Sequence, residues 1–174
     1  GPRADQARVS GSGLVLAERR DSRRPDPLLR WTSLFAVGLV SCDVHVIGRG
    51  AVLVGMGERT APQAVEALAR RLFAAGAASS VIAVALPARR AFMHLDTVMT
   101  MVSPDTLVAF PGVLDDLRTW TLRPGDDPEA LVLTAEPDLF TPLTAALGIG
   151  ELRVLTTGGD GWEAEREQWD DGNN

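Results

Sequence analysis

His94 and Asp96, two residues that can exchange protons, stand two positions apart in the segment FMHLDTVMTMV. We predict that residues 94–102 form a strand, in which alternate side chains point to the same face. An imidazole and a carboxylate on one face can act together as an acid–base pair in catalysis. They can equally be a polar pair whose hydrogen bonds are satisfied at the end of a strand, and both interpretations stay open at this point.

Cys42 is the single cysteine of the chain, which excludes an intrachain disulfide and a cysteine metal cluster. If residues 40–43 are extended, Val40 and Cys42 share a face. The thiol would then lie near His94, where an imidazole can activate it as a nucleophile. The alternative is a small buried hydrophobe, as most free cysteines are. Because the chain has only two histidines, we expect no metal and no cofactor.

The composition is that of one acidic domain. The chain has 174 residues, 45% of them hydrophobic, and a net charge of -6, so a hydrophobic core can form. The acidic balance argues against nucleic acid and anionic membranes as partners, since both attract basic faces. No apolar run approaches the ~20 residues of a membrane span, and no signal-peptide pattern is present. We expect a cytoplasmic protein that binds a small molecule.

The order of the predicted elements is that of an α/β fold with mixed sheets. Residues 31–48 read as one or two strands, and a GRG turn joins them to a strand at 51–57, which makes an antiparallel hairpin. A helix is predicted at 61–76, with Thr60 as its N-cap and Pro62 in its first turn. The remaining predictions are strands at 79–87, 94–102, 106–112 and 129–136, a strand and turn at 117–127, a helix at 138–148, and a strand and turn at 152–160. Residues 1–30 read as a polar lead-in that is partly ordered at most, and residues 31–174 as the domain.

Three segments together resemble arginine deiminase. They are DVHVIGRGAVLVGMGERTAPQAVEALARRLFAAGA, MHLDTVMTMV and TGGDGWEAEREQWDDGNN, which occur in the order and spacing of that family. The resemblance covers roughly residues 35–174. It implies all or part of an α/β-propeller, in which ββαβ blades surround a central active site.

The resemblance also implies roles for single residues. In this family a cysteine thiolate attacks the guanidinium carbon of arginine, a histidine shuttles protons, carboxylates hold the guanidinium, and arginines clamp the substrate carboxylate. His94 matches the acid–base histidine, Asp96 a guanidinium-binding aspartate, and Arg59 a carboxylate-binding arginine. Asn173 or its neighbour Asn174 matches a polar residue near that carboxylate. Asp43 keeps a position of the family motif, where it binds ligand or caps a turn.

This sequence also departs from the family pattern. Val40 stands where the family has the glutamate of a Glu-Gly-Gly-Asp motif, and nothing in residues 1–39 reproduces the Thr-Arg-Asp motif. The inserted helical domain is missing, and the sequence ends at Asn174, before the segment that carries the nucleophilic cysteine.

We therefore expect a degenerate arginine-deiminase-like protein of specialised metabolism that has lost arginine hydrolysis. It would bind a less charged ligand or catalyse proton transfer through His94 and Asp96. The alternatives are a fragment of an active arginine deiminase and a non-catalytic interaction subunit. About three blades fit this length, taking ~45–50 residues per blade, and the exposed strand edges of an open propeller predict a homodimer or other oligomer.

Overall fold

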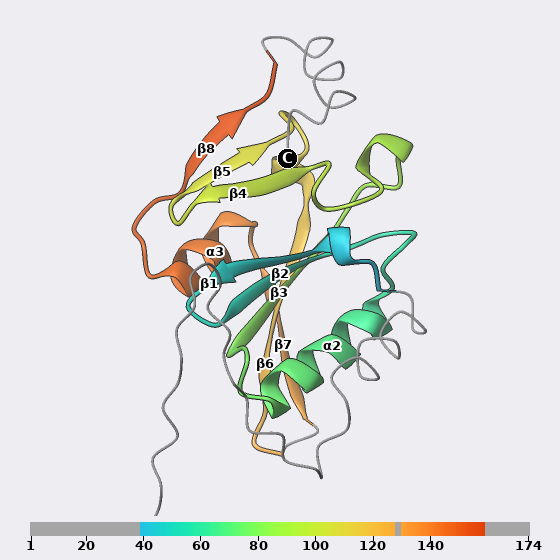
Figure 1. The fold of residues 1–174 in the computed structure, drawn as a ribbon, viewed down its shortest axis with the longest axis vertical. Coiled ribbons are helices and arrows are strands. Elements are labelled where there is room, and N and C mark those ends of the chain that lie inside the picture. The colour runs from blue at the N-terminus through green and yellow to red at the C-terminus, as the bar shows by residue number, and fades with distance from the viewer. Residues whose placement is uncertain (1–38, 128–129, 159–174) are drawn as a thin grey trace, which may run out of the picture.

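The computed structural model describes residues 39–127 and 130–158 (Figure 1). The predicted lead-in at 1–30, the part of the first strand region that precedes residue 39, and Asn173 lie outside these ranges. Within them the chain forms two mixed sheets and two α-helices, which confirms the α/β class.

The larger sheet has five strands in the order β1-β2-β3-β6-β7. The strands β1 (Val44–Gly48) and β2 (Ala51–Met56) form the predicted antiparallel hairpin. Helix α2 (Pro62–Ala74) then crosses to β3 (Ser80–Ala85), which runs parallel to β2. The antiparallel strands β6 (Arg118–Pro124) and β7 (Leu131–Glu136) extend the sheet beyond β3.

The smaller sheet has three strands in the order β4-β5-β8. The strands β4 (Met99–Ser103) and β5 (Thr106–Ala109) form an antiparallel hairpin, as the SPD turn predicts. After helix α3 (Phe140–Leu147), strand β8 (Arg153–Thr156) pairs parallel to β5. Each sheet therefore contains an antiparallel hairpin and a strand parallel to the second strand of that hairpin. In the larger sheet α2 connects the two, whereas in the smaller sheet β6, β7 and α3 all intervene. Three short 3-10 helices complete the described part: η1 (Ser41–Asp43), η2 (Arg90–Phe92) and η3 (Leu114–Asp116).

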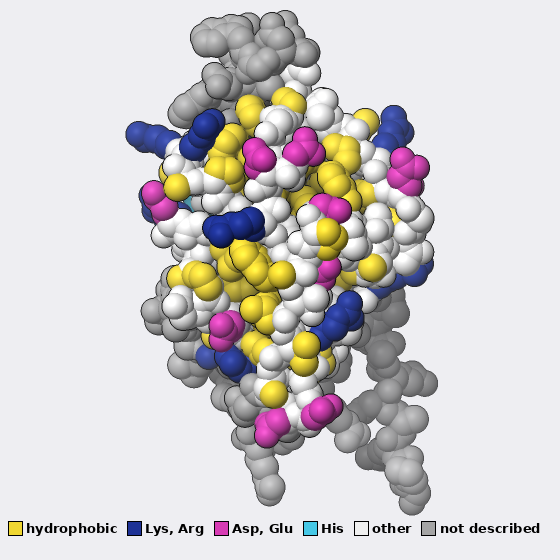
Figure 2. Space-filling view, turned by 180° about the vertical axis from the view of Figure 1, so that it is seen from behind, with side chains coloured by type: hydrophobic (Ala, Val, Ile, Leu, Met, Phe, Trp, Pro, Cys, Tyr) yellow, Lys and Arg dark blue, Asp and Glu magenta, His cyan; other side chains and the backbone are white. Residues whose placement is uncertain are grey.

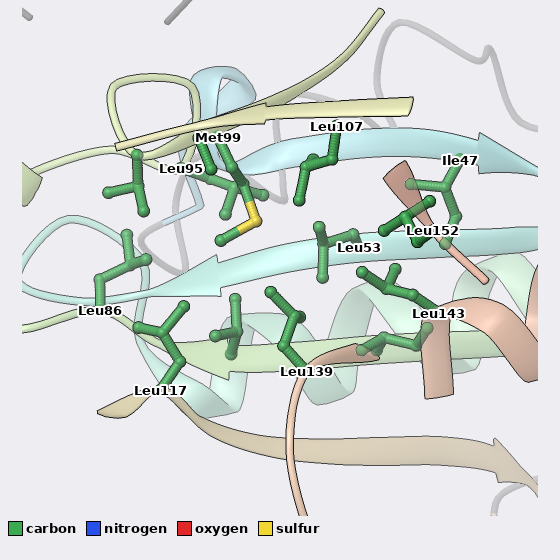
Figure 3. Packing of buried hydrophobic residues seen from close by; sticks show 14 of the residues in the cluster. Ile47, Leu53, Leu86, Leu95, Met99, Leu107, Leu117, Leu139, Leu143 and Leu152 are labelled. Carbon is green, nitrogen blue, oxygen red and sulfur yellow. The ribbon is translucent and has the colours of Figure 1, made fainter. Parts of the chain in front are cut away.

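The larger sheet lies between two apolar clusters. Alternate residues of a strand face opposite sides, so Val52 and Val54 of β2 pack with α2, whereas Leu53 packs with the smaller sheet and α3. Figure 1 shows α2 on one side of β2 and β3 and the smaller sheet on the other. Figure 3 shows Leu53 between Leu107 and Leu143 in the larger cluster.

The two helices end where the sequence predicts, and begin in different ways. Gly76 and Gly148, which follow them, both have a φ of +63°, a conformation that favours glycine. Helix α3 begins where the Asp138 carboxylate accepts the Thr141 backbone N–H at 2.6 Å. Helix α2 begins at Pro62, one residue after its predicted start, and its N-cap is Ala61, without a side-chain hydrogen bond, so the prediction of Thr60 as N-cap is wrong.

Two predictions about the polar segments are wrong. Residues 40–43 are not extended, because Ser41–Asp43 form η1. The strand predicted at 94–102 begins only at Met99, so His94 and Asp96 lie in the turn before it and do not share a strand face. The N–H groups of Leu95 and Asp96 bond to Asp43 and to the Cys42 carbonyl rather than to a neighbouring strand.

The surface mixes hydrophobic and charged side chains. On the face seen in Figure 2, hydrophobic side chains gather across the middle, with basic and acidic ones spread among them. Large apolar side chains are exposed on β1, at Val46, and on β7, at Val132 and Leu133. None of the described helices is long and apolar enough to cross a membrane.

Candidate functional site

Asp43 is a buried carboxylate that joins three separate parts of the chain. Its side chain is 1% exposed. Its Oδ2 accepts the Thr60 hydroxyl at 2.5 Å, and its Oδ1 accepts the Leu95 backbone N–H at 2.9 Å. The same Thr60 oxygen accepts the Val40 backbone N–H at 3.2 Å. The hydroxyl predicted to cap α2 thus binds Asp43 instead, because this buried carboxylate needs donors.

His94 lies against the same carboxylate. Its Nδ1 is 3.4 Å from Asp43 Oδ1, but this buried nitrogen lacks the alignment of a hydrogen bond to any described partner. The imidazole side chain is 22% exposed, so one part of the ring reaches solvent. The carboxylate nearest to Nδ1 therefore comes from η1, and a protonated His94 would be paired with Asp43.

Cys42 and Asp96 form a second contact between the same two segments. The Asp96 backbone N–H donates to the Cys42 carbonyl at 3.2 Å, and the Asp96 carboxylate is close enough to act on the thiol. Cys42 is exposed, so the expectation of a buried hydrophobe is wrong. Partial shielding from solvent raises the pKa of the thiol, and the Asp96 carboxylate raises it further. These surroundings disfavour the thiolate and do not activate a nucleophile.

This environment predicts that the Cys42 thiol reacts slowly at neutral pH, because little of it is thiolate. We expect the pH at which Cys42 reacts half-maximally with a disulfide reagent to lie above that of a free cysteine. Asp96→Asn removes the negative charge, so this pH should fall toward the ordinary value. Asp115→Asn, on exposed η3, should leave it unchanged. A wild-type thiol that already reacts as a thiolate at neutral pH would contradict the raised pKa.

His45 also belongs to this cluster and was not among the site residues predicted from the sequence. Burial lowers its pKa, and the carboxylates of Asp96 and Asp43 oppose that effect in part. The imidazole is therefore neutral at pH 7. The DVH spacing, with Asp43 and His45 two positions apart on the way into β1, is the signal that could have indicated it.

His45 should make stability depend on pH. A lowered pKa means that the unfolded chain takes up a proton near pH 6.5, before the folded protein does. The free energy of unfolding should therefore fall as the pH drops below about 6.5, until the folded protein is protonated as well. Urea titrations at several pH values should show this fall in the wild type and a smaller one in His45→Gln. Parallel curves for the two proteins would exclude His45 as its source.

Comparison with known families adds to this geometry. A family model for arginine deiminase matches residues 37–174, which is most of the chain. The chain belongs to the arginine deiminase family. The match includes both polar segments, the one around Asp43 and the one around His94.

Within an arginine deiminase domain, the predicted site residues fall into three groups. The buried contacts bring together Asp43, His94 and the backbone of Val40, and Asp96 and Cys42 adjoin them. Arg59 is exposed in the turn before α2, and among the described residues no ion pair involves it. Asn173 lies outside the described ranges, so its predicted contact stays a prediction. No three His, Cys, Asp or Glu side chains of the described part are placed to hold a metal ion.

Gly55 of β2 positions the His94 turn of this arginine deiminase family member. A Cβ at residue 55 would lie 2.9 Å from the Leu95 Cβ and 3.0 Å from the Leu86 Cδ1. Only glycine allows the turn to pack this closely on the strand. Its occurrence inside the apolar run AVLVGM is a sequence signal of such an approach.

Proposed function

We propose that this arginine-deiminase-like protein has lost arginine hydrolysis and now binds a less charged ligand or catalyses a reaction on it. The main support is that both Asp43 carboxylate oxygens are taken up by donors of the protein itself. Asp96 is then the one carboxylate of the cluster that remains partly accessible. A guanidinium is held best by two or more carboxylates, each making charge-assisted hydrogen bonds, so a single one holds it weakly.

Val40 supports the same proposal. Its backbone N–H donates to Thr60, which ties it to the Asp43 network, and its side chain is half-buried. An isopropyl group therefore stands where the family pattern has a glutamate. Leaving one side of a charge pair without its partner costs about 2–5 kcal/mol, which disfavours a cationic ligand and favours a neutral or apolar one.

The chemistry left to this cluster is proton transfer by His94. Asp43 Oδ1 lies 3.4 Å from the His94 Nδ1, and a bond formed there on ligand binding would leave the other ring nitrogen to give or take a proton. Asp96, on the other side of the turn, would hold a polar group of that ligand. An isomerisation, cyclisation or dehydration needs no more than this, and it requires no covalent intermediate on Cys42.

Activity and binding measurements with L-arginine test this proposal. They distinguish a site that lacks the glutamate for the guanidinium from one that still binds arginine. The protein should form no citrulline from L-arginine, and L-arginine should shift the His94 ring signals only weakly in NMR titrations. Val40→Glu restores a second carboxylate and should tighten L-arginine binding about tenfold or more. Val46→Glu adds the same charge on the exposed side of β1 and should not.

Two results would overturn the proposal. One is citrulline formation by the wild type that His94→Ala abolishes, which would favour a fragment of an active arginine deiminase. The other is L-arginine binding by Val40→Glu that is no tighter than binding by Val46→Glu. In that case the missing glutamate would not explain the weak binding of a guanidinium.

We also propose that the two sheets are blades of a partial propeller whose open edges pair with a second copy. Strand β7 supports this, because it pairs only with β6 in the described sheet, and Leu133 on it is 62% exposed. Unpaired apolar edges favour association. Light scattering should give a mass above that of one 18.5 kDa chain at micromolar concentrations. Leu133→Lys should shift the measured mass toward that of the monomer. A wild-type protein that is monomeric at every concentration tested would contradict the pairing.

A further inference from the structure

A groove lies beside the His94 cluster, at the carboxyl ends of three strands. Its volume is about 880 Å³, and its walls include the residues that follow β3, β5 and β8. The arrows of β5 and β8 point the same way in Figure 1, as their parallel pairing requires. Ligands of α/β sheets bind where the carboxyl ends of parallel strands meet. The volume falls within the ~300–1,000 Å³ typical of small-molecule sites.

Apolar side chains line the inner part of this groove. The rings of Phe92 and Phe110 meet edge to face, with their centroids 5.3 Å apart. Phe92 belongs to the main core cluster and Phe110 packs against it, so the pair is held in place from behind. Buried Val113 adds to the same wall. An apolar body, best a flat aromatic one, would be held against these rings.

Three charged side chains stand around the groove. Arg89 and Arg118 are basic and Asp116 is acidic, and all three are exposed. Among the described residues, neither arginine has an ion pair. The Arg118 guanidinium lies 5.8 Å from the centroid of the Trp120 ring, a cation–π contact that limits its freedom. The Arg89 backbone N–H donates to the Pro87 carbonyl at 2.7 Å, which fixes that loop.

These charges fit a monoanion. Two guanidinium groups and one carboxylate leave one net positive charge at the groove, whereas a phosphate would bring about two negative charges. The planar guanidinium matches a carboxylate through two parallel hydrogen bonds. We propose that this groove binds an aromatic carboxylate, with its anion at Arg89 and Arg118 and its ring on Phe92 and Phe110.

This site is separate from the proposed His94 chemistry. None of the described residues that line the groove is Asp43, His94, Asp96 or Arg59. A smaller hollow of about 310 Å³ shares the wall at Arg89 and Phe92 and extends to Met93 and Glu58. The groove can therefore be occupied whether or not the His94 cluster retains any reaction.

The experiment uses 2-naphthoate and its neutral analogue 2-naphthamide. In amide NMR spectra of the whole chain, 2-naphthoate should shift the signals of Gly112 and Thr156, which line the groove, and leave that of Val102 on β4 in place. The carboxylate should bind about tenfold more tightly than the amide, because only the carboxylate forms charge-assisted bonds. Added salt should weaken the binding of the carboxylate alone.

Matched variants locate the anion. Arg89→Gln and Arg118→Gln should each weaken 2-naphthoate binding about tenfold. Arg90→Gln and Arg123→Gln, at exposed arginines on the same two segments but outside the groove, should change it less than about twofold. All four positions are exposed, so thermal melts should show intact folds. Equal binding of 2-naphthamide, or equal losses in the groove and control variants, would overturn the proposal.

Discussion

Asp43→Ala should lower the free energy of unfolding by about 3–5 kcal/mol, because it removes a buried carboxylate that accepts two hydrogen bonds. The carboxylate is 1% exposed and accepts two hydrogen bonds, from the Thr60 hydroxyl and the Leu95 N–H. Alanine leaves both donors buried without an acceptor, and each unsatisfied donor costs about 1–3 kcal/mol. His94 Nδ1 also loses its nearest carboxylate.

The effect should extend beyond stability, because Asp43 holds the His94 turn from 52 positions away in sequence. In Asp43→Ala, the Leu95 amide should exchange its hydrogen much faster than in the wild type, and more than the stability loss alone explains. Urea unfolding measures the first effect, and native-state hydrogen exchange measures the second. Both observations follow from the one hydrogen bond at Oδ1.

Controls separate the network from a general loss of charge. Asp115→Ala removes an exposed acid and should change stability by less than about 0.5 kcal/mol. Thr60→Val removes the hydroxyl that bridges Val40 and Asp43, and should cost about 1–2 kcal/mol. Because Thr60 and Asp43 share a hydrogen bond, the double variant should lose less than the sum of the two single losses. Additive losses would show that the two residues act independently.

Local patterns predicted the regular elements well. The apolar run before Met56 and the β-branched run SVIAVA became β2 and β3. Helical spacing of apolar residues, with a glycine just beyond the last turn, gave α2 close to its predicted bounds. Each of these elements depends on interactions between near neighbours and on one buried face, both of which a sequence displays directly. The family resemblance, too, is confirmed over residues 37–174.

The polar segments could not be predicted in the same way, because their partners are distant in sequence. An apolar, β-branched context made residues 94–102 resemble a strand, and nothing local showed that the Leu95 N–H would bond to Asp43. Likewise, Thr60 has the side chain of a good N-cap, but a buried carboxylate 17 positions earlier takes its hydroxyl. Tertiary hydrogen bonds overrode local propensity at the residues that build the candidate site.

Leu95→Ala should also have a large effect, about 2–5 kcal/mol of lost stability, because a buried leucine is truncated. Leu95 is 0% exposed and belongs to the core cluster that the two sheets enclose (Figure 3). The backbone of Gly55 passes directly beneath its Cβ, so β2 cannot move closer to fill the cavity that alanine leaves. We therefore expect the loss to fall in the upper half of this range.

Comparison variants test whether the cavity causes this loss. Val102→Ala also truncates an apolar side chain, but one that is 55% exposed, and should cost less than about 0.5 kcal/mol. Leu95→Met nearly conserves the volume and should cost less than about 1.5 kcal/mol. Since Leu95 lies between His94 and Asp96, the alanine variant should also loosen the Asp96 N–H bond to Cys42 and speed its hydrogen exchange. A small loss of stability in Leu95→Ala, with unchanged exchange at Asp96, would mean that the turn is held by its hydrogen bonds alone and not by the packing of this side chain.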